Sequence, residues 1–573
     1  MVSTSSSMTS LVRAFRQWAV GARVPRPPEV AGASSSETLT LGALGGIARA
    51  IADERVADWP PDVRRWAEVA PTPPEELMEA IRQSIGSEQD PLSALYEASI
   101  SAANRRRLGT VFTPKLLVDY MVEQAAKELS SPPACVIDPG AGVGAFTIAA
   151  ARRWPSARVV AIDVNVVTLG LLAARLAFEA DHPECSEDVA QIDLVHQDYL
   201  DALPAFFEGD AAGPVLALGN PPYTRVQELP DSMRKRAVDL SGDILKSGHA
   251  NLAVIFQAAT LTSMRNDDVS CMVLPGSLSY THASHGLRHT LWNSRRAVSV
   301  SRTRATTRAF TGRSVQAAVL LIGAERKKRT PMHFSRVEIS DGSLNTVEEW
   351  KQSRSSPEPN NWFWISGSQH HSQEDDVLYL SDVAVVRRGI ATGANELFFL
   401  TDAETSKMPE DVIVAAVPSL RGFSGETLDE AAHKTMGGDN ARRWLLSVPH
   451  DYPLSGALAA RIREYEPEVK KRHLPSKRKL WYSITDFSRP QILIAPLSKS
   501  GFRVVLNEIE AVPSNNLFGI SMRNGGSPTP LAHWLRSDKG QSELRRISRR
   551  YHGGSFKLEP GSLAALRLPK NFS

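Results

Sequence analysis

The stretch that decides the fold runs Val136-Ile137-Asp138-Pro139-Gly140-Ala141-Gly142-Val143-Gly144-Ala145-Phe146. A short apolar strand leads into three alternate glycines, and a helix is expected to begin at about Ala145. Glycines let the backbone turn tightly and approach a ligand closely, because they carry no side chain. A lone glycine-rich turn is a weak signal, since it could equally cradle a dinucleotide pyrophosphate. The pattern predicts a strand–turn–helix unit of an α/β sheet.

An acid stands immediately before these glycines. Asp138 and Pro139 put a carboxylate where a bound phosphate would otherwise sit, and the two negative charges would repel each other. A carboxylate suits a cationic amino-acid group instead, such as that of S-adenosylmethionine. We therefore predict an S-adenosylmethionine site at this turn. Its predicted residues here are Asp138, Pro139, Gly140, Gly142, Gly144 and Phe146.

Two later strands also end in acids. The run Arg158–Asp163 ends in a carboxylate that can accept hydrogen bonds from both hydroxyls of a ribose, as acids do in dinucleotide folds. Because the following residues look helical, Asp163 could instead cap that helix, and both roles can hold. The strand Ile192–Gln197 is followed by an acid that can bond the adenine amino group of a cofactor. The predicted cofactor site therefore also includes Asp163, Asp198 and Tyr199.

Upstream, Thr113 and Pro114 precede an amphipathic helix with Leu117 and Met121 on its apolar side. We expect Thr113 to cap this helix and Pro114 to occupy its first position. Capping alone would explain both residues. The functional interpretation adds that the turn packs over the methionine end of the cofactor, so both residues join the predicted cofactor site.

A second motif, Asn220-Pro221-Pro222-Tyr223, follows an apolar run at 215–219 that indicates a buried parallel strand. The two prolines stop the strand and leave little backbone freedom. Asn220 and Tyr223 are therefore presented at the edge where open α/β sheets bind ligands. An amide oxygen and a peptide carbonyl can accept hydrogen bonds from a planar NH2 group, while an aromatic ring stacks on the base that carries this group. That combination favours alkylation of an exocyclic amine, although the motif alone could be a proline-rich surface turn.

The chain divides into four predicted regions. Residues 1–100 carry helical patterns and form an N-terminal extension whose role cannot be inferred. Residues 101–339 alternate apolar strands with helices, which indicates a doubly wound, Rossmann-like α/β catalytic domain. Residues 340–361 are polar and are predicted to be a linker. Residues 362–573 hold shorter strand-like runs, tryptophans and basic clusters, and are predicted to form an α+β domain.

Composition limits the function classes. The 42 % hydrophobic and 23 % charged residues are typical of a globular protein, and no stretch is long and apolar enough to span a bilayer. A net charge of +3 is too small to argue for nucleic acid, so that argument needs local clusters. Cys135, Cys185 and Cys271 are scattered, which predicts neither disulfides nor a metal site. Residues 1–28 could be a transit peptide or a frayed basic terminus; we expect the latter, and a cytoplasmic protein.

With these motifs in this order, residues 104–325 resemble the gamma-class N6-adenine DNA methyltransferases of bacterial restriction–modification systems. The resemblance implies methyl transfer from S-adenosylmethionine to adenine in double-stranded DNA. It implies that Asn220, Pro221, Pro222 and Tyr223 form the catalytic motif. The stretch Ala309-Phe310-Thr311-Gly312 is similar to a loop that supplies a second aromatic ring facing the target base in that family. Phe310 is therefore a catalytic candidate, although it could equally be a core phenylalanine.

The resemblance extends loosely into residues 362–573, which would be a target-recognition domain. Arg387–Asn395 is similar to a Gly-Ile-x-Thr-Gly-x-Asn element of such domains, and Tyr551–Gly554 resembles their final segment. Basic residues cluster at 470–479 beside Trp481 and Tyr482, and again at 545–550. Such clusters can bind phosphates, although each could instead be a solvated helix face. A cognate restriction endonuclease is a possible partner, and we expect a monomer without a membrane partner.

Two alternatives remain open from the sequence. Asn-Pro-Pro-Tyr also occurs in methyltransferases that act on an RNA base amine or on a protein glutamine amide. Those enzymes are usually compact, whereas more than two hundred residues follow the predicted catalytic domain here, which favours a large DNA partner. The third possibility is a non-catalytic nucleic-acid-binding subunit. The intact glycine turn and Asn-Pro-Pro-Tyr motif argue against it.

Overall fold

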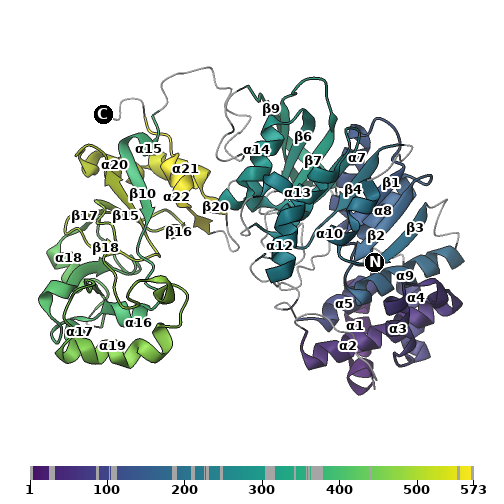
Figure 1. Cartoon of the computed structure of the whole chain (residues 1–573), viewed down its shortest axis with the longest axis horizontal. Helices are drawn as coiled ribbons and strands as arrows, with labels where there is room; N and C mark the ends of the chain where they lie inside the picture. Colours follow the sequence, from purple (N-terminus) through teal and green to yellow (C-terminus); the bar gives the residue numbers. More distant parts are fainter. Residues whose placement is uncertain are drawn as a thin grey trace. The chain divides into compact units, whose positions relative to one another are not determined.

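The computed structural model of the chain divides into two compact units, Met1–His370 and His371–Ser573. It describes residues 4–22, 24, 33–85, 90–101, 104, 113–182, 190–207, 213–224, 226, 231–245, 250–279, 281–303, 317–340, 343–355, 358, 362, 378–438, 440–550 and 555–569. Figure 1 shows the helices and strands of both units. Each unit is described separately below.

A large mixed sheet forms the centre of the first unit. Among the described residues its strands lie in the order β3-β2-β1-β4-β5-β7-β6-β8-β9. The first five are parallel, β7 is antiparallel to both of its neighbours, and β8 pairs with β9 in antiparallel register. The strands are β1 (Cys135–Pro139), β2 (Arg158–Asp163), β3 (Gln191–His196), β4 (Val215–Gly219), β5 (Val269–Pro275), β6 (Arg296–Thr303), β7 (Ala317–Glu325), β8 (Met332–Ser340) and β9 (Ser343–Gln352).

Helices cover both faces of this sheet, as predicted for a doubly wound fold. On one face, alternate strand residues such as Val136 and Leu216 pack with α7 (Lys115–Glu128) and α8 (Ala145–Arg153). On the other face, Ile137 and Ala217 pack with helices that include α13. This alternation follows from the two-residue period of a strand. The second face carries α10 (Tyr199–Ala202), α11 (Pro204–Phe207), α12 (Asp231–Leu240), η4 (Gly242–Ile244), α13 (Leu252–Ser263), η5 (Gly276–Ser279), η6 (His282–Ser284) and α14 (His285–Asn293).

The N-terminal extension is helical, and it packs onto the catalytic region. Its helices share one hydrophobic core with α9 (Val166–Asp181), the helix that follows β2, and Figure 1 shows them beside that helix. The residues of this core include Leu41, Leu44 and Ile47 from the extension and Leu169 and Leu172 from α9. The elements of the extension are α1 (Thr4–Gly21), α2 (Ser35–Ala52), η1 (Asp53–Asp58), α3 (Pro61–Glu68), α4 (Glu75–Ser84) and α5 (Pro91–Ser99).

The predicted linker at 340–361 is wrong. Residues 343–352 form β9, and the Trp350 ring stacks on Phe334 of β8 at 5.7 Å between ring centroids. Trp362 is fully buried against the edge of the same phenylalanine, so the first unit extends past position 361. The reason for the error is that β9 is an edge strand. Its outer face is largely exposed and polar, so its composition resembles that of a loop.

In the part of the second unit that the structure describes, short strands form three small sheets and combine with helices, which agrees with the predicted α+β character. Its elements are α15 (Leu380–Val383), β10 (Ala384–Arg388), α16 (Asn395–Phe398), β11 (Phe399–Leu400), α17 (Asp402–Thr405), η8 (Glu410–Val412), β12 (Ile413–Val417), β13 (Thr427–Leu428), α18 (Glu430–Thr435), β14 (Trp444–Leu446), α19 (Gly456–Val469), η9 (Pro475–Lys477), β15 (Ile492–Ile494), β16 (Leu497–Ser498), β17 (Val504–Asn507), β18 (Val512–Pro513), β19 (Phe518–Met522), α20 (Pro528–Arg536), α21 (Asp538–Ile547), β20 (Arg549–Arg550), β21 (Phe556–Lys557) and α22 (Pro560–Ala564). Among the described residues, no helix has the length and apolar character needed to cross a lipid bilayer.

Candidate active site

The glycine turn leaves the carboxyl end of β1 in the predicted way. The backbone N–H groups of Gly140 and Ala141 both donate to the carbonyl of Ile162, at 2.9 and 3.0 Å, which ties the turn to the end of β2. Gly140, Gly142 and Gly144 all have positive φ, between 58° and 88°, so each lies in the region that favours glycine. A Cβ on Gly142 would meet nothing within 4 Å, which leaves open space beside the turn for a ligand.

Asp138 is the buried acid of the site. Its side chain is 1 % exposed, and its Oδ2 accepts a hydrogen bond from Thr147 Oγ1 at 2.7 Å. Among the described residues, no group donates to the buried Oδ1. Burial raises the pKa of Asp138 from 3.8 to about 7, an effect that the nearby Asp163 carboxylate increases and the Thr147 hydrogen bonds oppose. A cationic ligand group at Oδ1 would satisfy both the orphaned oxygen and the buried charge.

Asp163 ends β2 and accepts two backbone hydrogen bonds. Its Oδ2 accepts from the Gly142 N–H at 2.7 Å, and its Oδ1 accepts from the Asn165 N–H at 2.8 Å. The helix cap is Asn165, whose Oδ1 accepts from the Val167 N–H, so the alternative that Asp163 caps α9 is wrong. Burial raises the pKa of Asp163, while these hydrogen bonds oppose the shift. Because a carboxylate has about four lone-pair positions, Asp163 can still accept a ribose hydroxyl.

Asp198 lies after β3 and caps α10. Its Oδ1 accepts from the Leu200 N–H at 2.9 Å, and burial raises the pKa of this half-buried carboxyl. Tyr199 is 2 % exposed, its ring packs against Phe256, and its hydroxyl shares a 2.7 Å hydrogen bond with Thr260. Tyr199 is therefore a core residue, and its predicted place in the cofactor site is corrected. Only Asp198 of this pair offers an accessible polar group.

Phe146 requires the same correction. Its side chain is 4 % exposed and belongs to the core between α7, α8 and the sheet. The sequence placed Phe146 in the site because it follows the glycines directly, but the first turn of α8 directs this ring into the core. Gly144, which precedes the helix, packs so closely on α9 that a Cβ would stand 2.1 Å from Leu172 Cδ1.

The Asn-Pro-Pro-Tyr motif leaves the carboxyl end of β4, beside the glycine turn. A Cβ on Gly219 would lie 2.9 Å from Asp138 Oδ1, and one on Gly140 would lie 3.6 Å from Pro222 Cδ. These two proximities join the predicted catalytic motif and the predicted cofactor turn at one sheet edge. Figure 1 shows β1 and β4 as neighbours in the sheet.

Thr113 holds Asn220. Helix α7 begins at Lys115 with Pro114 as its cap residue, and no side chain caps it, so the predicted capping by Thr113 is wrong. Instead, Thr113 Oγ1 accepts a hydrogen bond from Asn220 Nδ2 at 3.0 Å. The two residues are 107 positions apart in the chain, and their contact brings the Thr-Pro turn to the catalytic motif.

Asn251 supports the motif from its other end. Its Nδ2 donates to the carbonyl of Tyr223 at 2.9 Å, while its Oδ1 caps α13 through the Ala253 N–H at 3.0 Å. Tyr223 is half-buried, burial raises its pKa, and its hydroxyl has no hydrogen-bond partner among the described residues. The sequence did not predict this role of Asn251, although the segment before α13 is part of the family resemblance. Phe310 lies outside the described residues.

The N-terminal extension supports the cofactor side of the site. Tyr96 Oη accepts a hydrogen bond from Asn165 Nδ2 at 2.8 Å, two residues beyond Asp163. The Trp66 ring packs on α9 so closely that a Cβ on Gly170 would lie 2.2 Å from Trp66 Cζ3. These contacts give residues 1–100 a structural role that no motif in that region predicted.

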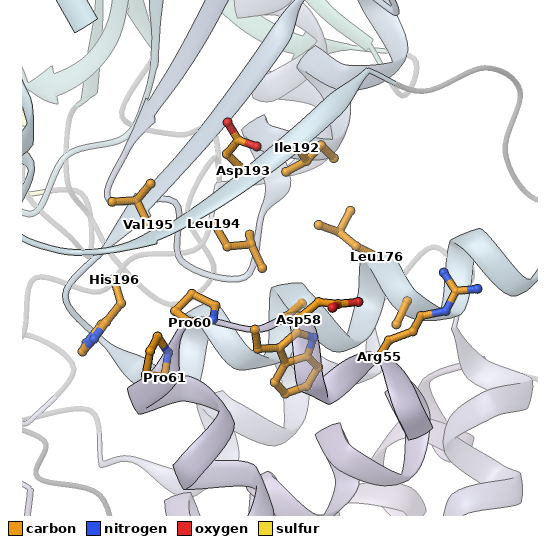
Figure 2. A pocket seen from close by; sticks show the side chains of 13 residues that line it. Arg55, Asp58, Pro60, Pro61, Leu176, Ile192, Asp193, Leu194, Val195 and His196 are labelled. Atoms are coloured by element: carbon orange, nitrogen blue, oxygen red, sulfur yellow. The ribbon is translucent and has the colours of Figure 1, made fainter. Parts of the chain in front are cut away.

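A hollow of about 990 Å³ opens between this extension and the edge strand β3. Figure 2 shows Arg55, Asp58 and Pro60 on one side and Leu194 and His196 on the other. Of the predicted cofactor and catalytic residues that the structure describes, none lines it. We assign it no ligand.

Comparison with known proteins covers both units. Residues 365–573 match the family model of the C-terminal domain of the type II methyltransferase M.Eco57I. The chain is 24 % identical over 479 residues to the type II methyltransferase M.XamI of Xanthomonas campestris pv. amaranthicola, a match that covers 81 % of this chain and 85 % of that protein. It is 20 % identical over 492 residues to M.AccI of Acinetobacter calcoaceticus, covering 82 % and 86 %. The chain is therefore similar to type II methyltransferases over most of its length.

The fold of this chain is shared with a solved structure. The type IIL restriction–modification enzyme MmeI, solved in complex with DNA, has a TM-score of 0.51 and 14 % identity, and the match covers 92 % of this chain and 78 % of that one. The predicted α/β fold is confirmed, and the similarity to type II methyltransferases supports the predicted resemblance to restriction–modification enzymes.

In the C-terminal unit, part of the basic cluster at 470–479 has internal partners. Arg478 stacks over Phe398 at 5.2 Å and donates to the carbonyls of Ala391 and Thr392, so it supports the Gly-Ile-Ala-Thr-Gly loop. Arg472 pairs with Glu396. The lysines at 471, 477 and 479 are exposed, and their role in phosphate binding stays a prediction. Tyr551–Gly554 lies outside the described residues.

Proposed function

We propose that this protein transfers a methyl group from S-adenosylmethionine to the N6 amine of an adenine in duplex DNA. The observation that carries the proposal is the junction of two motifs at one sheet edge, where Pro222 lies beside Gly140 and Gly219 lies beside Asp138. One edge thus offers both an acid for a cationic donor and an amide for an amine acceptor. The relationship to type II methyltransferases supports the same reaction class.

The residues at the glycine turn fit S-adenosylmethionine. The buried Asp138 Oδ1, which accepts no hydrogen bond from the described residues, suits the ammonium group, and the space beside Gly142 admits a ligand close to the backbone. Asp163 is held by two backbone N–H groups in an orientation that suits the ribose hydroxyls. Asp198 would serve the adenine amino group. When bound, S-adenosylmethionine supplies an electrophilic methyl group on a sulfonium.

Asn220 and Pro221 would act on the acceptor amine. The lone pair of N6 is delocalised into the adenine ring, which makes it a poor nucleophile. If Asn220 Oδ1 and the Pro221 carbonyl accept the two N6 hydrogens, the nitrogen can become tetrahedral and direct its lone pair at the methyl group. As the new C–N bond forms, the C–S bond of the donor breaks, and the fixed dipoles of the two oxygens stabilise the positive charge that develops on N6. Loss of one N6 proton to water then restores a neutral amine. The hydrogen bond from Asn220 Nδ2 to Thr113 supports the orientation that this step needs.

Access to the site requires that the adenine leave the duplex. Flipping a base costs a few kcal/mol. Stacking on an aromatic ring contributes about 1–3 kcal/mol and offsets part of that cost. Tyr223 is our candidate for this ring, with Phe310 as a second candidate. The prolines between Asn220 and Tyr223 limit rearrangement of the motif while the base enters.

The C-terminal unit would be the target-recognition domain. Its exposed lysines would bind phosphates, and binding would weaken with salt. We propose that the protein acts in the cytoplasm as a monomer, as the modification component of a restriction–modification or phage-defence system, with a cognate restriction endonuclease as a possible partner.

The test is incubation of the full chain with labelled S-adenosylmethionine and, in separate reactions, plasmid DNA, ribosomal RNA and a protein mixture. We expect label in DNA, and nucleoside analysis should identify it as N6-methyladenine. Label in cytosine would contradict the adenine assignment. Label in RNA or protein alone would replace the DNA proposal with the alternative acceptor class.

Two variants test the catalytic roles. Asn220→Ala should nearly abolish turnover while S-adenosylmethionine still binds, because the acceptor amine loses its partner and the three acids proposed to hold the cofactor are unchanged. Tyr223→Ala should weaken capture of the base more than Asn220→Ala does, which a KM for DNA would report. Asn440→Ala makes the same amide-to-methyl change at an exposed position and should leave both constants unchanged. Near-normal turnover of Asn220→Ala with the cofactor bound would disprove the mechanism.

A further inference from the structure

Helix α14 carries two histidines on one face. His285 and His289 are four residues apart, so they stand one above the other, and their rings stack with centroids 5.7 Å apart at 21°. Both are exposed, at 49 % and 62 % of the side chain. The methyl-transfer site described above uses neither residue.

A buried carboxylate faces this pair. Glu358 lies on the segment that follows β9, and its side chain is 4 % exposed. Its Oε1 accepts from Arg288 Nε at 3.1 Å. Its Oε2 is buried, and no described residue donates a hydrogen bond to it. Oε2 is therefore a nearly inaccessible negative atom that points at two imidazoles.

The distances match those of a metal site better than those of hydrogen bonds. Glu358 Oε2 lies 3.6 Å from His285 Nε2 and 3.6 Å from His289 Nδ1, which is too long for a hydrogen bond. The three ligand atoms all lie within 4.8 Å of one another. With metal bonds of about 2.0–2.2 Å, two ligands of a tetrahedral ion stand roughly 3.3–3.6 Å apart. The two measured distances fall at the upper end of that range.

We propose that His285, His289 and Glu358 bind one divalent transition-metal ion of the zinc type. Two imidazoles and one carboxylate are a ligand set that zinc uses with a fourth position open. Arg288 occupies Oε1 and so leaves Oε2 as a single, oriented donor, in the way that outer partners fix metal-ligating carboxylates. The bound ion would tie the segment after β9 to α14. This proposal does not depend on the proposed methyl transfer.

The competing explanation is a pair of ion pairs, in which protonated histidines neutralise Glu358. Asn293 Nδ2 also lies 3.4 Å from His289 Nδ1, and the metal bond would replace that contact. Arg288 already supplies one positive charge to the carboxylate at 3.1 Å. The imidazole nitrogens of His285 and His289 both stand 3.6 Å from Oε2, longer than the charge-assisted hydrogen bonds that protonated histidines would form with a carboxylate.

Zinc binding to the full, tag-free chain tests the proposal. Equilibrium dialysis against Zn²⁺ with metal analysis should give one ion per wild-type chain. His285→Ala and His289→Ala should each weaken zinc binding at least about tenfold, the smallest loss that even an outer metal partner causes. His333→Ala is the matched control, because His333 is an exposed histidine that faces a single carboxylate, Glu349, at 3.7 Å. It should leave zinc binding unchanged.

A second measurement uses stability. Zn²⁺ should raise the unfolding temperature of the wild type and of His333→Ala, and not that of His289→Ala, whose exposed ring can be removed without loss of the fold. The wild type should lose the rise when a chelator is added. Absence of stoichiometric zinc on the wild type, or equal zinc uptake by the wild type and His289→Ala, would overturn the proposal.

Discussion

The affinity of the protein for S-adenosylmethionine should depend on the ionisation of Asp138. Burial raises the pKa of this carboxyl to about 7, and only its ionised form attracts the ammonium group. About half of the Asp138 carboxyls are ionised at pH 7 and about 3 % at pH 5.5. The Kd of S-adenosylmethionine should therefore rise about fifteenfold as the pH falls from 7 to 5.5. This interval lies below about pH 7.7–8.0, where an α-amino group titrates.

Calorimetric titration of the full chain at pH 5.5, 6.0, 6.5 and 7.0 measures this dependence. Asp138→Asn keeps an oxygen for Thr147 but cannot ionise. Its Kd for S-adenosylmethionine at pH 7 should therefore be higher than that of the wild type by roughly ten- to hundredfold, the value of one charged hydrogen bond. This Kd should be nearly constant with pH. Asp193→Asn, which changes a carboxylate on β3 paired with Arg158, is the matched control and should behave as the wild type does. Equal pH dependence in the wild type and Asp138→Asn would refute the reasoning.

The same pKa also predicts a trend in stability. The folded pKa of Asp138 exceeds the ordinary value of 3.8, so between about pH 4 and 7 the folded state holds a proton that the unfolded state has released. The free energy of unfolding of the cofactor-free protein should therefore fall as pH rises through this window, by up to about 4 kcal/mol from this group. In Asp138→Asn this contribution should disappear, which denaturant unfolding at pH 5 and 8 would detect.

Two further substitutions test the supports of the site. Thr113→Val removes the acceptor for Asn220 Nδ2 and should lower kcat about tenfold, with little change in the Kd of S-adenosylmethionine. Thr113→Ser keeps the hydroxyl and should keep most activity. Equal kcat values for Thr113→Val and Thr113→Ser would contradict the positioning role. Gly170→Ala places a Cβ 2.2 Å from Trp66 and should lower the free energy of unfolding by about 1–3 kcal/mol, as measured by thermal melting. In the same assay Gly561→Ala, where nothing lies within 4 Å of the new Cβ, should be neutral or stabilising.

The parts of the site that the sequence predicted are those fixed by local backbone geometry. The glycine turn and the prolines after β4 each restrict the chain within a few residues, so Asp138 and Asn220 could be assigned to strand ends. The parallel order of the sheet then brings those strand ends to one edge. Asp163 and Asp198 follow by the same rule. The polar edge strand β9 was missed because its exposed face has the composition of a loop, which hides its antiparallel pairing with the preceding strand β8.

The residues whose roles were wrong or missed depend on contacts far along the chain. A threonine before a helix satisfies every local criterion for a cap. Thr113 Oγ1 nevertheless accepts a hydrogen bond from Asn220, 107 positions away, instead of capping the helix. Asn251 shows that one side chain can do both tasks, because its oxygen caps α13 while its amide nitrogen holds Tyr223. Phe146 lies next to the glycines in sequence, but helix geometry directs its ring to the core. A position next to a site in the sequence therefore predicts the role of the backbone more safely than the role of the side chain. Substitutions of the residues that support Asn220 should change turnover without changing binding.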